Sequence, residues 1–182
     1  IAGTQHSLEV SLKLSALGQS LPGDGEKIAL ANAHRIVTAA DEVGAWVTVD
    51  AEDHTTTDST LSIVEELRRD FPTLGTVLQA YLHRTEADCR HFSGSGSRIR
   101  LCKGAYKEPA GVAFQKAAEV DASYVRCLKV LMEGDGYPMV ASHDPTMIDD
   151  LWHATINGRG QMYMANDSDA MRIALQAAFG DI

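Results

Sequence analysis

Apolar and polar residues follow two different spacings along this chain. In residues 8–17 apolar side chains occupy every second position, which is typical of a half-buried strand, here one that carries Lys13. Residues 26–42 place apolar side chains three or four positions apart, which predicts a helix that ends at Gly44. The branched residues of 45–50 predict a second strand. The chain therefore opens with a strand, a helix and a strand.

The same alternation of strands and helices continues along the chain. No hairpin signal such as Asn-Gly separates neighbouring strands, so we expect parallel strands joined by helices, which is an α/β fold. The further predicted elements are a helix over 60–70 capped by Asp58 or Ser59, a strand over 75–82, a helix over 86–92, a strand from Arg98 that breaks at Gly104, a helix over 119–133 and a strand over 137–142.

The carboxyl end of each predicted strand carries polar residues. In parallel β/α architectures these ends lie at one edge of the sheet, where functional sites are found. The recurrence across five strands is therefore the main functional signal, and it is stronger than any single motif. The residues are Lys13, Asp50 with Glu52, Gln79, Arg100 with Lys103 and Tyr106, and Ser142 with His143.

Residues 98–109 show this feature most clearly. They begin as a strand, break at Gly104, and place Arg100, Lys103 and Tyr106 around the break. Cations and a phenol at a strand end favour binding of an anion or an electron-rich ring. A Lys-Gly pair is also compatible with an ordinary solvated turn, so this stretch by itself does not decide between the two.

Composition narrows the class of protein. The 182 residues are 45% hydrophobic and 23% charged, which predicts one folded domain over residues 1–182. Asp and Glu outnumber Lys and Arg by 25 to 16, and this net charge of −9 disfavours nucleic-acid binding. We find neither an apolar run of about 18 residues nor a signal peptide. Cys89, Cys102 and Cys127 lack metal-ligand spacing, which predicts reduced thiols in a cytoplasmic protein without a metal site.

Five runs within about residues 8 to 150 carry a family resemblance. They are VSLKLSAL from Val10, VTVDAEDHTTTDSTL from Val47, VLQAYLHRTEADC from Val77, RIRLCKGAYKEP from Arg98, and SYVRCLKVLMEGDGYPMVASHDP from Ser123. In identity and order these runs are similar to the proline dehydrogenases, flavoenzymes built on a distorted TIM-type β/α barrel. The likeness is to the single-function actinobacterial type.

This resemblance implies a reaction and its partners. Proline dehydrogenases oxidise L-proline to pyrroline-5-carboxylate, with FAD taking a hydride and a quinone reoxidising the flavin. The resemblance therefore implies a role in proline catabolism, linked to a pyrroline-5-carboxylate dehydrogenase. A quinone acceptor implies peripheral contact with the cytoplasmic face of a membrane, and a homo-oligomer is compatible with the sequence.

The resemblance also implies residue roles on the substrate side. Lys13 matches the lysine that pairs with the proline carboxylate, and Asp50 matches the acid that supports the substrate-binding cations. Tyr106 matches the tyrosine that packs on the proline ring. Arg100 matches the arginine beside the flavin nitrogen that accepts the hydride, where a fixed cation favours the reduced flavin.

The remaining matched residues lie on the cofactor side. The resemblance implies that Gln79 hydrogen-bonds the flavin ring and that the Lys103-Gly104-Ala105 turn lies against FAD, with Gly104 allowing close backbone approach. Glu52, Asp53 and His54 have no match, and we expect them to form a solvated loop. Ser142 and His143 match strand-end residues near the ribityl and phosphate part of FAD.

The chain also departs from the family. A complete barrel of this class has eight strands in about 250 residues, whereas five strands are predicted here, so we expect a partial barrel. Residues 157–182 show no clear match beyond an echo at Gln161 and Met162, and they predict a helix over 170–179. The arginine pair that binds the proline carboxylate in the family is not found, so turnover by this chain is uncertain.

Three alternatives to proline oxidation remain at this stage. Lys13 in a barrel is compatible with a Schiff-base aldolase, and Asp50, Glu52, His54 and His143 are compatible with a metal-dependent lyase. The third alternative is an incomplete, non-catalytic fragment that self-associates through open sheet edges.

Overall fold

A computed structural model of the protein describes residues 8–145 and residue 148. The chain divides into two compact units. Leu8–Ala141 form one of them, and Ile1–Ser7 with Ser142–Ile182 form the other. Because each unit is described by itself, a single domain over residues 1–182 stays a prediction.

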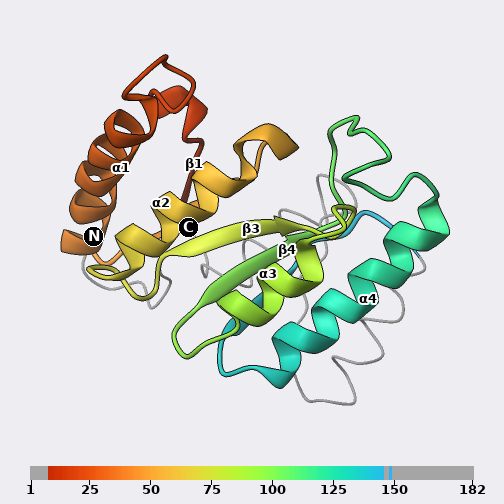
Figure 1. Ribbon diagram of the computed structural model, residues 1–182. Helices are drawn as coiled ribbons and strands as arrows, with labels where there is room; N and C mark the ends of the chain where they lie inside the picture. Colours follow the sequence, from red (N-terminus) through yellow and green to blue (C-terminus); the bar gives the residue numbers. More distant parts are fainter. Residues whose placement is uncertain (1–7, 146–147, 149–182) are drawn as a thin grey trace, which may run out of the picture. The chain divides into compact units, whose positions relative to one another are not determined.

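The unit of residues 8–141 is built on one parallel sheet, as Figure 1 shows. Every neighbouring pair of strands is parallel, and the strands lie side by side in chain order, which is the order of a β/α barrel. The predicted α/β class with parallel β/α units is confirmed. The strands are β1 (Glu9–Leu12), β2 (Trp46–Val49), β3 (Gly75–Gln79), β4 (Arg98–Cys102) and β5 (Tyr137–Val140).

Each connection between consecutive strands contains a helix, as parallel pairing requires. In Figure 1, α3 is seen in front of strand β4. Two short 3-10 turns precede α1 and α2, at Ser15–Leu17 (η1) and His54–Thr56 (η2). The α-helices are α1 (Gly25–Glu42), α2 (Thr57–Arg68), α3 (Thr85–Phe92) and α4 (Ala117–Glu133).

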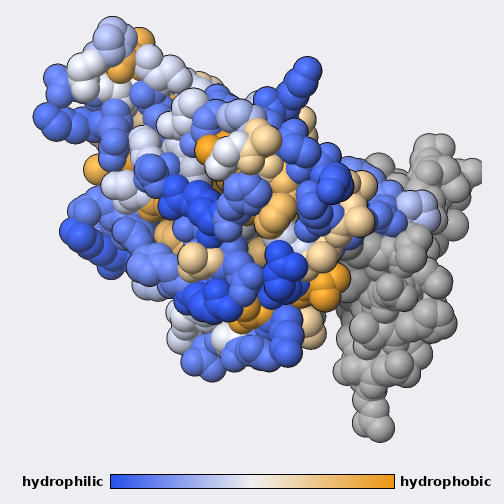
Figure 2. Space-filling model, turned by 45° about the vertical axis from the view of Figure 1, so that its right-hand side comes forward, coloured by the Kyte–Doolittle hydropathy of each residue, from blue (hydrophilic) through white to orange (hydrophobic). Residues whose placement is uncertain are grey.

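Alternate residues of the strands form the core with the helices. Val49, Ile99 and Leu101 are almost fully buried, and the hydroxyl of Tyr124 on α4 donates to the carbonyl of Leu101 at 3.1 Å. The surface in Figure 2 is mostly hydrophilic, with hydrophobic residues in smaller groups, in keeping with the net charge of −9. Within the described residues, no helix combines the length and hydropathy needed to cross a bilayer.

Three predicted boundaries are wrong, one of them being the end of the strand predicted over 75–82, which stops at Gln79. β1 stops at Leu12, so Lys13 lies outside the strand and is exposed, because the chain turns there into η1. The helix predicted over 60–70 begins at Thr57, so Asp58 and Ser59 lie inside α2 and do not cap it. The predicted helix over 170–179 and the segment at 161–162 lie outside the described residues.

Candidate functional site

One face of the sheet carries charged side chains. Side chains alternate along a strand, so Arg98 and Arg100 of β4 project from the face opposite buried Ile99 and Leu101. In a parallel sheet, paired residues point the same way. The register therefore adds Val77, Met139 and Tyr137 to this charged face, along with Glu9, Ser11, Trp46 and Thr48.

Arg100 joins three strands on the charged face. Its Nη1 donates to Asp50 Oδ1 at 3.3 Å and to Ser11 Oγ at 3.2 Å, and its Nη2 donates to Glu9 Oε1 at 3.2 Å. Asp50 follows β2 directly and its amide donates to the carbonyl of Leu12 on β1. Two predicted site residues, Arg100 and Asp50, are therefore brought into contact. The guanidinium is held in one orientation by acceptors on β1 and at the end of β2.

Arg98 and Glu9 are charged residues that the sequence analysis missed. The side chain of Arg98 is only 6% exposed and pairs with Glu9 at 3.3 Å, while its guanidinium carbon lies 3.5 Å from the ring centre of Trp46 and 5.6 Å from that of Tyr137. Burial lowers the pKa of Arg98, and Glu9 opposes that effect. The Arg-x-Arg spacing in β4 is the sequence signal that places both arginines on one face.

Lys13 is not part of the Arg100 cluster. It follows β1 at the same edge of the sheet as Asp50, and its side chain is exposed. No ion pair joins Lys13 to Asp50 in the part of the chain that the structure describes. A carboxylate arriving from solvent can therefore reach the ammonium group of Lys13.

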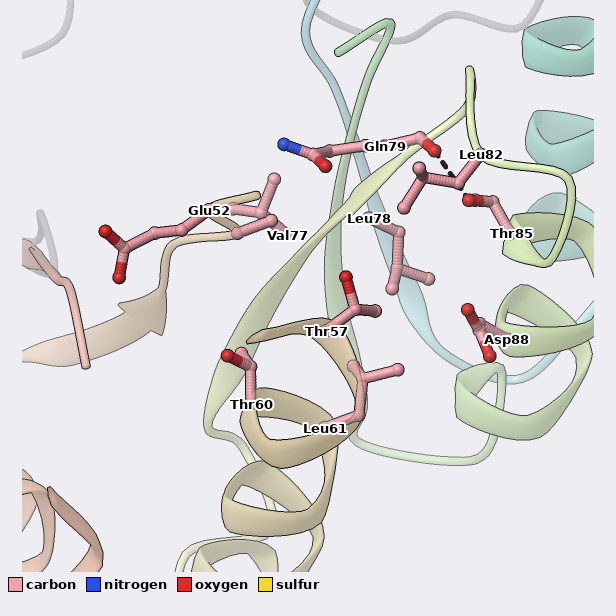
Figure 3. A pocket seen from close by; sticks show the side chains of 11 residues that line it. Glu52, Thr57, Thr60, Leu61, Val77, Leu78, Gln79, Leu82, Thr85 and Asp88 are labelled. Carbon is pink, nitrogen blue, oxygen red and sulfur yellow. Dashed lines mark hydrogen bonds between the residues drawn. The ribbon is translucent and has the colours of Figure 1, made fainter. Parts of the chain in front are cut away.

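Gln79 ends β3 with an unsatisfied polar atom. Its side chain is buried, and among the described residues its Oε1 has no hydrogen-bond partner. Figure 3 shows the amide pointing away from Leu82 and Thr85, while the Gln79 carbonyl accepts from Thr85 Oγ1 at 2.5 Å. The pocket in Figure 3 lies between α2, β3 and α3 and is small, with a volume of about 20 Å³. A buried amide oxygen without a donor marks a place for a ligand N–H group.

The turn after β4 is shaped by a glycine. Gly104 has φ +117°, and a Cβ placed there would overlap the ring of Tyr81. Lys103 Nζ reaches Asp121 Oδ1 on α4 at 2.5 Å, so its side chain is directed to a helix. Ala105 and Tyr106 are exposed. The turn therefore presents backbone and a phenol ring to solvent.

Replacing Gly104 by alanine is expected to destabilise the protein by about 2 kcal/mol, because the side chain both strains the left-handed backbone and overlaps the Tyr81 ring. Gly23→Ala is the matched control: Gly23 has φ +78°, but a Cβ added there would meet no atom within 4 Å, so about 1 kcal/mol of backbone strain is expected. Urea unfolding of both variants measures the difference. Equal losses would contradict the overlap.

The loop between β2 and α2 is not the solvated loop predicted from sequence. Glu52 accepts from the backbone N and Oγ of Ser15 at 3.1 and 2.7 Å, which fixes the turn that follows Lys13. Asp53 accepts from the amide of Thr55 at 2.9 Å and begins η2. His54 contacts Glu108 in the loop after β4. These residues connect loops, and the sequence carried no local signal for such long-range pairs.

Ser142 and His143 follow β5 and belong to the second unit. Ser142 Oγ accepts from the amide of Asp144 at 3.1 Å, and His143 is exposed. Their contribution to a cofactor site stays a prediction.

Comparison with known proteins decides the family. A family model described as proline dehydrogenase matches residues 2–165. The chain belongs to the proline dehydrogenase family. Proline dehydrogenase of Deinococcus radiodurans is 42% identical over 144 residues, which cover 78% of this chain and 46% of that protein. Proline dehydrogenase 1 of Bacillus subtilis is 38% identical over 148 residues, which cover 81% of this chain and 48% of that protein.

This member of the family spans about half the length of these relatives. Solved structures agree on the fold. Proline utilization A of Bdellovibrio bacteriovorus superimposes with a TM-score of 0.71 at 23% identity, over 84% of this chain and 19% of that one. Proline utilization A with proline bound in remote sites gives a TM-score of 0.73 at 21% identity, over 100% of this chain and 22% of that one.

Family membership and geometry disfavour the alternative functions. Asp50, Glu52 and His54 each bond to a different protein partner, and no group of three metal-binding side chains occurs within residues 8–145 and 148. The exposed Lys13 lacks the apolar enclosure that an aldolase lysine requires. Self-association through β1 and β5, the outer strands of the described sheet, is not favoured by the family match.

Proposed function

We propose that this chain carries part of the active site of a proline dehydrogenase, which oxidises L-proline to pyrroline-5-carboxylate with FAD as hydride acceptor. The observation that supports this most strongly is the fixed guanidinium of Arg100, held by Asp50, Ser11 and Glu9 on the charged face of the sheet. A cation held by several acceptors is prepared to stabilise negative charge that develops in a reaction.

The residues present fit FAD. Gln79 offers a buried amide oxygen without a donor, and a flavin ring carries an N–H group that would satisfy it. Gly104 has no Cβ, and the Tyr81 ring packs against the turn in the space that a Cβ would take, which sets the course of the backbone that FAD would meet. When bound, FAD supplies the hydride-accepting ring. Lys103, whose side chain is directed to Asp121, would contribute through its backbone, as would Ala105.

The chain's own side chains would bind and orient proline. The exposed ammonium of Lys13 would pair with the substrate carboxylate, and Asp50 at the same sheet edge would balance the charge of Arg100. Tyr106, which is 40% exposed, would pack on the pyrrolidine ring. Orientation of substrate and cofactor in this way accounts for several kcal/mol of barrier reduction.

The electron acceptor in this proposal is a quinone, which implies peripheral contact with the cytoplasmic face of a membrane. The product, pyrroline-5-carboxylate, would be consumed by a dehydrogenase acting on it.

Ser142 and His143 would bind the ribityl and phosphate part of FAD.

Spectroscopy tests the proposed function. Purified protein titrated with FAD is expected to show a shifted flavin absorption band, and anaerobic L-proline is expected to bleach that band, while D-proline leaves it unchanged. The control is free FAD mixed with L-proline, which keeps its absorption. A protein that leaves the flavin spectrum unaltered at all FAD concentrations would contradict the proposal.

A further inference from the structure

We propose that Tyr81, Glu108 and His54 form a positioning unit that holds the Lys103-Gly104-Ala105 turn in its cofactor-receiving conformation. This inference rests on the proposed function. The three residues come from the loops after β3, β4 and β2, and the family resemblance assigns no role to any of them.

Glu108 is the centre of this positioning unit. Its side chain is 4% exposed, and its carboxylate accepts from the backbone N of His54 at 2.9 Å and from the hydroxyl of Tyr81 at 3.3 Å. The imidazole Nδ1 of His54 also contacts the second carboxylate oxygen. A buried carboxylate is costly unless donors satisfy its oxygens. Glu108 therefore keeps the loops after β2, β3 and β4 together.

Tyr81 connects this carboxylate to the turn. Its ring is packed against Gly104, and its backbone N donates to the carbonyl of Lys103 at 2.8 Å. Burial raises the pKa of Tyr81, and the nearby Glu108 raises it further, so the phenol stays protonated and remains a donor at neutral pH. The position of the ring therefore decides where the Gly104 backbone lies.

The geometry separates this role from ordinary core packing. Tyr124 is a buried tyrosine whose hydroxyl donates to the carbonyls of Leu101 and Ala141 at 3.1 and 3.3 Å, on β4 and directly after β5. Loss of either hydroxyl removes hydrogen bonds from the same unit of the protein. Of these two tyrosines, Tyr81 is the one whose ring contacts Gly104. Removal of the Tyr81 hydroxyl should therefore change the conformation of the turn.

The experiment compares Tyr81→Phe with Tyr124→Phe in the full chain. Tyr81→Phe keeps the ring on Gly104 and removes the hydroxyl, which donates to Glu108 and also interacts with the backbone amide of Tyr106. We expect it to raise the Kd for FAD about tenfold and to speed amide exchange of residues 104–106 in the apoprotein about tenfold, which corresponds to loss of one hydrogen bond to a charged acceptor. Tyr124→Phe is expected to lower Tm while leaving both quantities within about twofold of wild type.

A second variant changes Glu108, the residue that accepts the hydrogen bond from Tyr81. Glu108→Gln keeps an acceptor for Tyr81 and is expected to fall between wild type and Tyr81→Phe in both measurements. Unchanged amide exchange at 104–106 in Tyr81→Phe would overturn the inference, as would equal effects of Tyr124→Phe. A wild-type protein that fails to bind FAD would refute the proposed function. The positioning unit would still be tested, because the amide exchange of Tyr81→Phe and Tyr124→Phe is compared in the absence of FAD.

Discussion

Arg100→Met is expected to slow the reduction of bound flavin by L-proline at least about 100-fold, with a much smaller effect on FAD retention. The methionine keeps much of the side-chain volume but removes the cation held by Glu9, Asp50 and Ser11. In the proposed site, negative charge that develops on the acceptor ring would then lose its fixed counter-charge. Anaerobic stopped-flow absorbance measures the rate of bleaching, and ultrafiltration measures retained FAD.

The control for this prediction is Arg126→Met. Arg126 lies on α4 with its side chain 49% exposed and pairs with Glu86 at 3.2 Å, so its loss removes a surface ion pair and should leave the bleaching rate unchanged. Wild-type bleaching by Arg100→Met would remove this arginine from the reaction. A parallel loss of bound FAD would instead assign Arg100 to cofactor retention.

Glu9→Ala is expected to lower the free energy of unfolding by about 4 kcal/mol. Glu9 is the carboxylate shared by Arg98 and Arg100, at 3.3 and 3.2 Å, and it also accepts from Thr48 Oγ1. Its removal leaves the buried guanidinium of Arg98 without its acid on a face that also carries Arg100. Urea unfolding followed by circular dichroism measures the change.

Glu66→Ala provides the matched control for Glu9→Ala. Glu66 pairs with Arg69 at 2.8 Å on the surface of α2, and its side chain is 48% exposed, so its loss should change stability by no more than about 0.5 kcal/mol. An unfolding midpoint of Glu9→Ala equal to that of Glu66→Ala would show that Arg98 is stabilised by Trp46 and Tyr137 without the acid.

The order and direction of the strands could be predicted from the sequence, because residue spacing distinguishes strands from helices and the connections are too long for hairpins. The residue at which β1 ends could not be predicted from the sequence. The alternating pattern continues through Lys13 and Leu14, yet Leu14 is buried from a turn and not from a strand. A buried side chain reached from a turn leaves the same alternation in the sequence as one reached from a strand.

The candidate site was predicted in part. Asp50 and Arg100 meet because both lie toward the carboxyl ends of parallel strands, a relation that topology alone fixes. Glu9 and Arg98 lie near the other ends of their strands, where sequence rules place no site. The contact between His54 and Glu108 spans 54 positions, and neither residue type indicates the other. Long-range pairs of this kind become visible only once the loops are placed in space.

The loop between β2 and α2 has a consequence for how this enzyme family can adapt. Glu52 bonds to the turn after Lys13, and His54 bonds to the loop that carries Tyr106. One short segment therefore links the turn after Lys13 with the loop that carries Tyr106, the two residues proposed to contact the carboxylate and the ring of proline. A substitution that moves the turn after Lys13 is therefore expected to move the loop that carries Tyr106 as well. Adaptation to a differently shaped amino acid would require the contacts of both residues to change together.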